Sequence, residues 1–255
     1  MRMSKKLGQV FLANAHVARA EAEHAHGKRV LEIGPGRGIL TRELCRNAKS
    51  VVAVEKDKRL YDYLWLTLKS GNLRLLNADF FRLSDTELDL DGIDILIANI
   101  PYNLSSKTVG WIIEKGKEAV LCMQKEFVEH MLAGPGTRKY SKLSVISALR
   151  LSVTEIMPVP RSYFFPVPRV DSEVVYIRPK TLNISRAEEN AISCLMQHKK
   201  KRLKNAIEDS RLSLGIERNS AAALASAVAT PDERVFKISP ERLLTIARQI
   251  VKESN

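Results

Sequence analysis

The sequence predicts an α/β protein with a doubly wound parallel sheet in its N-terminal part and a smaller all-helical domain at its C-terminal end. Two observations lead to this prediction. From residue 28 onward, short apolar segments alternate with amphipathic stretches, as strands and helices do around a parallel sheet. Beyond about residue 182 the pattern is helical. We therefore expect one domain over residues 1–182 and a second over residues 183–255.

The strands of the N-terminal domain are expected at the short apolar segments. These read RVLEIG from residue 29, SVVAVEKD from residue 50, LRLLNADF from residue 73, IDILIANIPY from residue 93 and EAVLCMQKE from residue 118. Helical patterns follow the first two segments, over residues 39–48 and 58–70, and Gly71 ends the second helix. Short buried strands in such an order are typical of parallel sheets.

Capping residues indicate where two helices of the C-terminal domain begin. Ser185 and Glu188 form the S-x-x-E pattern of a capping box. Ser239 precedes Pro240, and proline suits the first turn of a helix. The stretch between these two sites has a helical pattern that Gly215 interrupts.

Composition and charge narrow the class of protein. Lys and Arg number 41 against 29 Asp and Glu, so the formal charge is +12 and nucleic acid is the expected partner. The three cysteines are far apart, which argues against a disulfide framework and fits a reducing cytoplasm. The five histidines show no ligand spacing, so we expect no metal. With no secretory signal and no apolar run of ~20 residues, we expect a soluble cytoplasmic protein without a membrane partner.

A glycine turn follows the first strand and polar residues end the next three, at the points where a ligand would meet the sheet. Gly34 and Gly36 lie in a turn after the first strand, where the backbone can come close to a ligand. Glu55, Asp79 and Asn99 end the next three strands. The carboxyl ends of parallel strands line one crevice, and ligands of open α/β sheets bind there. Each feature alone has a structural reading, such as a tight turn, but the four together indicate a binding site.

Two ligands fit such a crevice, a nicotinamide dinucleotide and S-adenosylmethionine. The glycines read G-x-G-x-G after an acid, which differs from the G-x-G-x-x-G of dinucleotide sites. A dinucleotide would also need a second half-site, whereas the C-terminal part is helical and basic. The pattern therefore favours S-adenosylmethionine, with Glu55 accepting hydrogen bonds from the ribose hydroxyls.

The sequence Asn99-Ile100-Pro101-Tyr102 would end the fourth strand beside the methyl group of that donor. The amine of adenine is a poor nucleophile because its lone pair is delocalised into the ring. The Asn99 side-chain carbonyl and the Ile100 backbone carbonyl can accept its N–H bonds, which favours a pyramidal nitrogen in the transition state. Tyr102 can stack on an extracted base. The alternative is a simple strand terminator with a buried tyrosine.

At this point the sequence resembles a known family. KKLGQVFL, LEIGPGRGILT, VVAVEKD, NADF, NIPYNLSS and VPRSYFFPVPRVDSEVV occur in the order typical of the KsgA/Dim1 family of small-subunit ribosomal RNA adenine dimethyltransferases. The resemblance is strong over residues 5 to about 180, looser beyond, and nearest to the archaeal branch. It implies a Rossmann-like methyltransferase sheet and a monomer. It also implies transfer of four methyl groups to N6 of two adjacent adenines in a 3′-terminal hairpin of small-subunit rRNA, with a role in subunit maturation.

The resemblance also implies roles for individual residues. Gln9 and Leu12 would lie in the segment that closes over the donor, with Gly34 and Gly36 near its methionine part. Glu55 would bind the ribose and Asp79 the adenine amine of the donor. Asn99 and Tyr102 match the catalytic turn, and Phe164 matches the aromatic residue on the other side of the target base. Val10 departs from the family, where Asn is common; it is either a lining residue of the donor site or a staple that packs the N-terminal segment.

Basic residues gather at two places. Lys5 and Lys6, with Arg2, precede the expected donor site. A second group lies on a predicted helix and comprises Lys199, Lys200, Lys201, Arg202 and Lys204. A charge run of this kind is often a solvated helix face. In a chain with this net charge we favour contacts with RNA phosphates, which position a protein without reading bases.

Two rival functions remain open on the sequence. One is the related large-subunit rRNA methyltransferase of the antibiotic-resistance type, which shares the NIPY motif. The other is a non-enzymatic ribosome assembly factor on the same fold. The presence of Glu55, Asp79 and Asn99 argues against the second, because a pure binder needs no donor site.

Overall fold

The computed structural model describes residues 10–230 and 232–254, and they form two compact units. The first unit runs to Val128 and resumes from Val153 to Pro179, and the second comprises Glu129–Ser152 and the chain from Lys180 onward. The boundary expected after residue 182 thus lies near the observed division at residues 179 and 180. The second unit also takes in residues 129–152, because Tyr140, Val145 and Leu149 are buried in its helical core.

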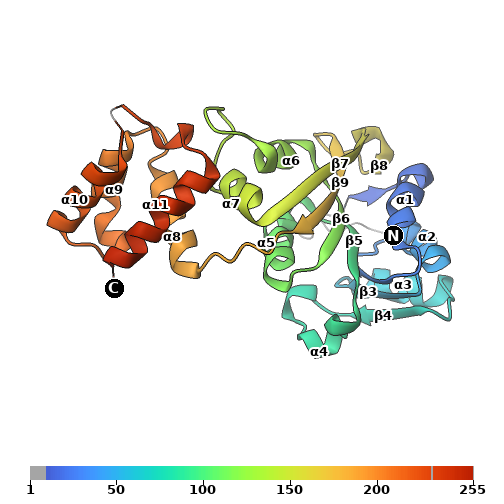
Figure 1. The fold of residues 1–255 in the computed structure, drawn as a ribbon. Coiled ribbons are helices and arrows are strands. Elements are labelled where there is room, and N and C mark those ends of the chain that lie inside the picture. The colour runs from blue at the N-terminus through green and yellow to red at the C-terminus, as the bar shows by residue number, and fades with distance from the viewer. Residues whose placement is uncertain (1–9, 231, 255) are drawn as a thin grey trace. The chain divides into compact units, whose positions relative to one another are not determined.

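A seven-stranded sheet forms the centre of the first unit in the described part of the chain. Its strand order is β4-β3-β2-β5-β6-β9-β7 (Figure 1). The parallel strands are β2 (Arg29–Ile33), β3 (Ser50–Glu55), β4 (Leu73–Asn77), β5 (Ile95–Asn99) and β6 (Glu118–Gln124). They correspond to the five strands expected from the sequence, and the order reverses between β2 and β5. The sequence analysis did not anticipate β7 (Leu151–Val159) or β9 (Ser172–Pro179), which pairs antiparallel with β6.

Helices of the first unit connect these strands. They are α1 (Ala15–Ala22), α2 (Ile39–Asn47), α3 (Lys58–Thr67), α4 (Asp85–Leu88) and α5 (Ser105–Lys115), and α6 (Lys125–Leu132) crosses the division between the units. Asn14 begins α1, because its side chain accepts hydrogen bonds from the backbone N–H groups of His16 and Val17. Buried side chains of α1 and α2 form one core with alternate residues of the strands, including Ile95 and Ile97 of β5.

Two short strands join the beginning of the described chain to a segment far along it. In this two-stranded sheet, β1 (Phe11–Leu12) pairs antiparallel with β8 (Phe164–Phe165). Leu12 lies opposite Phe164, and the backbone N–H of Ala13 donates to the Tyr163 carbonyl at 2.7 Å. The end of the KKLGQVFL motif therefore lies beside the VPRSYFFPVPRVDSEVV motif.

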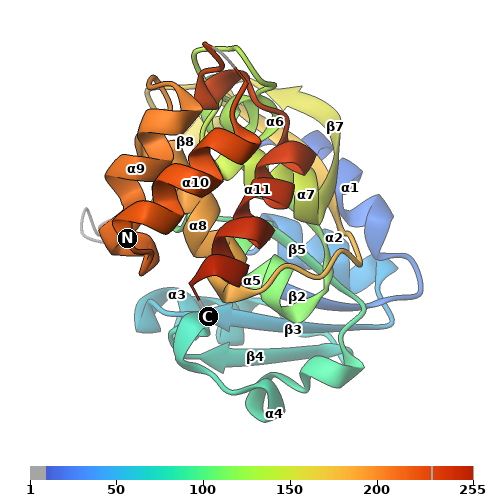
Figure 2. The same ribbon diagram turned by 60° about the vertical axis from the view of Figure 1, so that its left-hand side comes forward.

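The second unit is helical, as expected (Figure 2). Its helices are α7 (Lys142–Arg150), α8 (Arg186–Gln197), α9 (Leu203–Leu214), α10 (Arg218–Val228) and α11 (Pro240–Glu253). Both helix starts expected from the sequence are confirmed, because Ser185 and Glu188 form a capping box and Ser239 caps α11. Gly215 ends α9 with a φ of 69°.

Candidate active site

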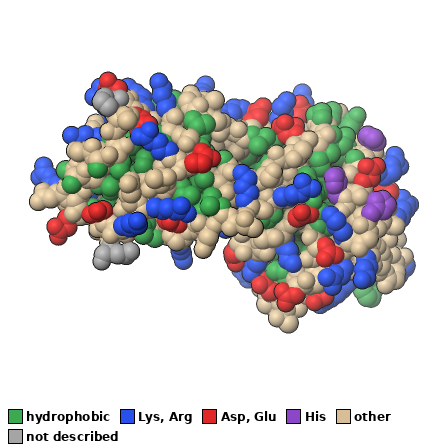
Figure 3. Space-filling view, in the orientation of Figure 1, with side chains coloured by type: hydrophobic (Ala, Val, Ile, Leu, Met, Phe, Trp, Pro, Cys, Tyr) green, Lys and Arg blue, Asp and Glu red, His purple; other side chains and the backbone are tan. Residues whose placement is uncertain are grey.

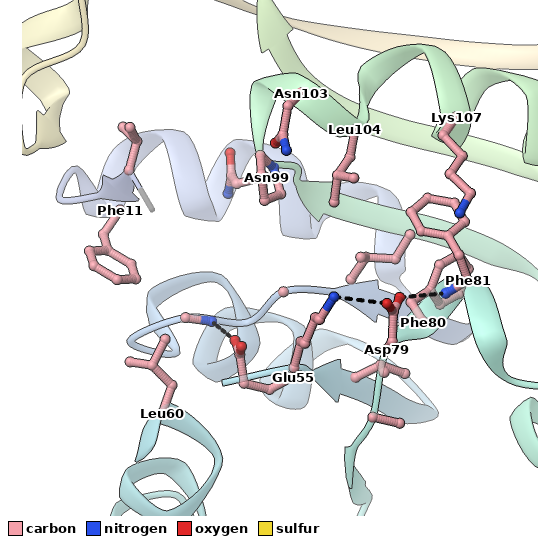
Figure 4. A pocket seen from close by; sticks show the side chains of 18 residues that line it. Phe11, Glu55, Leu60, Asp79, Phe80, Phe81, Asn99, Asn103, Leu104 and Lys107 are labelled. Carbon is pink, nitrogen blue, oxygen red and sulfur yellow. Dashed lines mark hydrogen bonds and ion pairs between the residues drawn. The ribbon is translucent and has the colours of Figure 1, made fainter. Parts of the chain in front are cut away.

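A cavity of about 270 Å³ opens at the carboxyl ends of the parallel strands in the first unit. The residues predicted for this site that line it are Val10, Gly34, Gly36, Glu55, Asp79 and Asn99. Figure 4 shows Glu55 and Asp79 on one side of the cavity and Asn99 on the other. The strand order reverses here, which is where an open α/β sheet leaves room for a ligand.

The Glu55 carboxylate is held in place by the backbone around it. One oxygen accepts the N–H of Gly36 at 3.1 Å, and the other accepts the N–H of Asp57 at 2.7 Å. Burial raises the pKa of Glu55 above its ordinary value, while these N–H donors act against that rise. Each oxygen keeps lone pairs for further donors, so the fixed carboxyl can accept hydrogen bonds from a pair of ligand hydroxyls.

Asp79 is an ionised acid on the same side of the cavity. The Lys56 ammonium donates to it at 2.9 Å and the backbone N–H of Phe81 at 3.2 Å. The hydrogen bond from Lys56 is the largest cause that lowers the pKa of Asp79 below its usual value. A carboxylate in this state is an acceptor only, which suits an amine or amide donor of a ligand.

The glycine turn after β2 approaches the cavity in a backbone conformation that favours glycine. Gly34 and Gly36 have φ values of 67° and 57°. A Cβ on Gly36 would lie 2.9 Å from Cδ1 of Phe11, a residue that also lines the cavity. The turn therefore forms a cradle whose shape depends on glycine at position 36, because a side chain there would displace Phe11 from the cavity wall.

A second, much smaller pocket adjoins the cavity at Asn99. Tyr102 and Phe164 line it together with Asn99 and Val10, and its volume is about 10 Å³. The Tyr102 hydroxyl lies 2.8 Å from Oγ of Ser172 in β9. A volume of this size holds about one water.

Asn99 lines both pockets, and a hydrogen bond from its amide nitrogen fixes the side chain on the side of α1. Its Nδ2 donates to Oε2 of Glu21 in α1 at 3.1 Å, whereas its buried Oδ1 has no hydrogen-bond partner among the described residues. The sequence analysis did not single out Glu21. A signal was present, because Glu21 interrupts the apolar positions Val17 and Ala18 of an amphipathic helix.

The remaining predicted residues of the site are placed differently. Leu12 is buried in the same core as the side chains of α1 and α2 and does not line the cavity. Gln9, Lys5 and Lys6 lie outside the described residues. Cavity-lining residues that the sequence analysis did not name include Phe11, Lys56, Leu60, Phe80, Phe81, Asn103, Leu104 and Lys107.

The basic segment from Lys199 to Arg202 is not helical, contrary to the prediction. It forms the turn between α8 and α9, and only Lys204 of the group lies on a helix. Backbone hydrogen bonds hold the turn, because the N–H groups of Val235 and Phe236 donate to the carbonyls of Lys201 and Lys199.

Several side chains of this basic group already form hydrogen bonds or ion pairs with neighbouring residues. The Lys199 ammonium donates to the Tyr140 carbonyl at 2.7 Å, Lys201 pairs with Asp209 at 2.7 Å, and Arg202 pairs with Asp232 at 2.6 Å. The exposed side chains of Lys200 and Lys204 pair with no acidic group in the described part of the chain. On the face drawn in Figure 3, basic side chains are interspersed with acidic ones.

The sheet order, the glycine turn and the acids after β3 and β4 define the class of Rossmann-like methyltransferases. Comparison with known proteins gives the family. The family model described as ribosomal RNA adenine dimethylase matches residues 1–252, and the chain belongs to that family. The resemblance seen in the motifs is thus confirmed.

Curated relatives match over nearly the full chain. A protein of Methanopyrus kandleri is 36% identical over 98% of this chain and 93% of its own length, and one of Thermococcus gammatolerans is 34% identical over 96% and 88%. Both are named probable ribosomal RNA small subunit methyltransferase A.

Two solved structures share the fold. A dimethyladenosine transferase from Plasmodium falciparum has a TM-score of 0.78 and 26% identity, and covers 95% of this chain and 98% of its own. The 23S rRNA methyltransferase ErmE has a TM-score of 0.64 and 25% identity, with 94% and 99% covered. The predicted Rossmann-like sheet with a helical C-terminal domain is confirmed by these structures.

No group of three or more His, Cys, Asp and Glu side chains among the described residues could hold a metal ion. No described helix is both long and apolar enough to cross a membrane.

Proposed function

We propose that this chain dimethylates N6 of two adjacent adenines in the 3′-terminal hairpin loop of small-subunit rRNA, with S-adenosylmethionine as methyl donor. The observation that carries the proposal is the position of Asn99. It lines both the larger cavity, which suits a nucleoside donor, and the small pocket beside it, where the rings of Tyr102 and Phe164 offer stacking surfaces for a base. Family membership supports the reaction class.

The residues of the cavity fit S-adenosylmethionine. Glu55 offers a fixed carboxyl for the ribose hydroxyls, and Asp79 offers an ionised acceptor for the adenine amine. The methionine part would lie along the turn at Gly34 and Gly36, where a Cβ at Gly36 would press on Phe11, a residue that lines the same cavity. When bound, the donor supplies an electrophilic methyl group on sulfur.

The residues around the smaller pocket prepare the adenine amine. The free Oδ1 of Asn99 accepts one N–H bond of the amine, and the Ile100 carbonyl is available for the other. Both contacts strengthen as the nitrogen gains positive charge, so they stabilise the transition state more than the ground state. Tyr102 and Phe164 hold the base by stacking. The amine's proton leaves to water, and no strong general base is required.

The small subunit is the favoured substrate for two reasons. The relatives from Methanopyrus kandleri and Thermococcus gammatolerans that match over most of the chain carry small-subunit names. The solved large-subunit enzyme ErmE resembles the chain less closely, at a TM-score of 0.64 against 0.78 for the dimethyladenosine transferase. We propose a cytoplasmic monomer that contacts rRNA phosphates through Lys200 and Lys204, both exposed in the second unit.

Methyl transfer from labelled S-adenosylmethionine to isolated ribosomal subunits tests the proposal. Unmethylated small subunits should take up label, and nuclease digestion with mass spectrometry should identify dimethyladenosine at two adjacent positions. Large subunits serve as the control. Label in large subunits alone would assign the chain to the resistance type, and tight subunit binding without label would indicate an assembly factor.

A further inference from the structure

Glu21 is an acidic residue at a position where the fold otherwise places apolar side chains. It lies on the buried face of α1 with Val17, Ala18 and Ala22, and its exposed fraction is 0%. Full burial of a carboxyl is rare, because removal of the group from water is unfavourable. Such a group is expected to have a specific polar partner.

That partner is the amide of Asn99. The Nδ2 of Asn99 donates to Oε2 of Glu21 at 3.1 Å, across 78 positions of sequence. Alternation along β5 explains the contact, because Ile95 and Ile97 belong to the core that α1 covers and Asn99 follows at the same spacing. Burial raises the pKa of Glu21 to about 8, and the hydrogen bond from Asn99 acts against that rise because it favours a carboxyl that accepts.

We propose that Glu21 is a positioning residue that anchors Nδ2 of Asn99 and thereby reserves Oδ1 of the same amide for the target amine. The inference rests on the proposed function and deepens it. An unanchored amide can turn over about its last bond, since the torsion of a terminal sp² group is broad and roughly two-fold. A turned amide would present N–H groups to an amine that is itself a donor, and the Ile100 carbonyl alone would remain as an acceptor.

The surroundings of Asn99 support this role. Its Oδ1 is buried and has no hydrogen-bond partner among the described residues, although its Nδ2 is satisfied. A buried acceptor without a partner is unfavourable in the free protein and becomes satisfied when a donor arrives. The same residue lines both the donor cavity and the pocket at Tyr102, so its orientation bears on the reacting centre.

Substitutions at Glu21 in the full-length chain test the proposal. Glu21→Leu removes the acceptor at similar volume, whereas Glu21→Gln keeps a neutral acceptor. We expect the leucine variant to lose between about 10-fold and 100-fold in kcat, as small misplacements of reacting groups do. Binding of S-adenosylmethionine, measured by calorimetry, should change less than about twofold, and the glutamine variant should recover most of kcat.

A control on the same helix separates positioning from stability. Val17→Ala opens a cavity in the same core and should lower the Tm without lowering kcat well below that Tm. The leucine variant should behave in the opposite way, with the Tm kept or raised and kcat reduced. Equal kcat in the wild type and the leucine variant would overturn the proposal, and so would equal losses in the leucine and glutamine variants.

A spectroscopic readout does not depend on activity. The side-chain amide signals of Asn99, labelled with ¹⁵N and assigned by their loss in Asn99→Ala, should move in Glu21→Leu and stay near their wild-type positions in Glu21→Gln. Unmoved signals in the leucine variant would refute the contact. A different outcome is that the wild type makes no dimethyladenosine while the Asn99 signals still move in Glu21→Leu. That result would refute the proposed function and leave the anchoring of Asn99 intact.

Discussion

The Tyr102 hydroxyl lies 2.8 Å from Oγ of Ser172, so the turn after β5 is tied to the first residue of β9. Burial raises the pKa of Tyr102, and the phenol is therefore neutral over the physiological range. The contact joins two motifs, NIPY and VDSEVV, that are separated by 70 positions.

Tyr102 is expected to act through its ring more than through its hydroxyl. Tyr102→Phe and Ser172→Ala each break the contact, and each should cost about 0.5–1.5 kcal/mol of stability. Tyr102→Ala also removes the stacking surface, and this loss should lower kcat/KM by an amount equivalent to about 1–3 kcal/mol. Denaturant unfolding and steady-state kinetics measure both effects. A phenylalanine variant as inactive as the alanine variant would assign the role to the hydroxyl.

Asn99 is expected to contribute to the transition state and little to donor binding. Asn99→Ala removes the acceptor Oδ1, and loss of one such group typically lowers kcat by about 100-fold or more. Single-turnover methylation of small subunits gives the rate, and calorimetry gives the Kd for S-adenosylmethionine. Wild-type turnover in the alanine variant would show that the amide has no catalytic part.

Gly36 is expected to be required for donor binding. The reason is the space that a side chain would take from Phe11, in addition to the positive φ of the backbone. Gly36→Ala brings a Cβ to 2.9 Å from Cδ1 of Phe11 at a φ of 57°. Gly116→Ala is a matched control, because Gly116 has a φ of 63° and nothing lies within 4 Å of the added Cβ. Both variants should lose about 1–2 kcal/mol of stability from left-handed backbone. Only Gly36→Ala should weaken S-adenosylmethionine binding; equal binding by both variants would contradict the cradle.

Glu32 predicts a pH dependence of stability. Burial raises its pKa from 4.5 to about 8, so between these pH values the unfolded chain has released a proton that the folded chain keeps. The free energy of unfolding should therefore fall as pH rises through this window and level off above it. Glu21 acts in the same direction, since its pKa is also raised to about 8.

Replacement of Glu32 by Gln should remove the part of this pH dependence that Glu32 causes. That part is a change of at most about 5 kcal/mol in the free energy of unfolding across the window. Denaturant unfolding of the wild type and the glutamine variant from pH 5 to pH 9 measures it. Parallel stability curves for the two proteins would mean that Glu32 keeps an ordinary pKa in the fold.

Lys200 and Lys204 are expected to carry more of the RNA contact than their paired neighbours. The double change to alanine should weaken rRNA binding across sequences and lower the salt slope of affinity by about 1.5, because each phosphate contact releases counterions. Lys201→Ala is the matched control, since Asp209 already compensates its charge at 2.7 Å. Binding is measured at several salt concentrations. A larger effect of Lys201→Ala would reverse this assignment.

Much of the fold and of the candidate site could be predicted from the chain alone. Strand periodicity located β2 to β6, because buried parallel strands are short apolar runs with polar ends. The positions of Glu55, Asp79 and Asn99 at the ends of successive strands then placed them at one edge of the sheet. Capping rules located the starts of α8 and α11, since these depend on hydrogen bonds within a single turn.

Tertiary packing determines the contacts between distant segments. It pairs Leu12 with Phe164, seats Glu21 behind Asn99, and turns the segment from Lys199 to Arg202 away from a helix. A local pattern reports what a residue prefers within a few neighbours. Which side chain meets which across 78 positions depends on how the helix α1 packs on the sheet, and that packing is a property of the whole core.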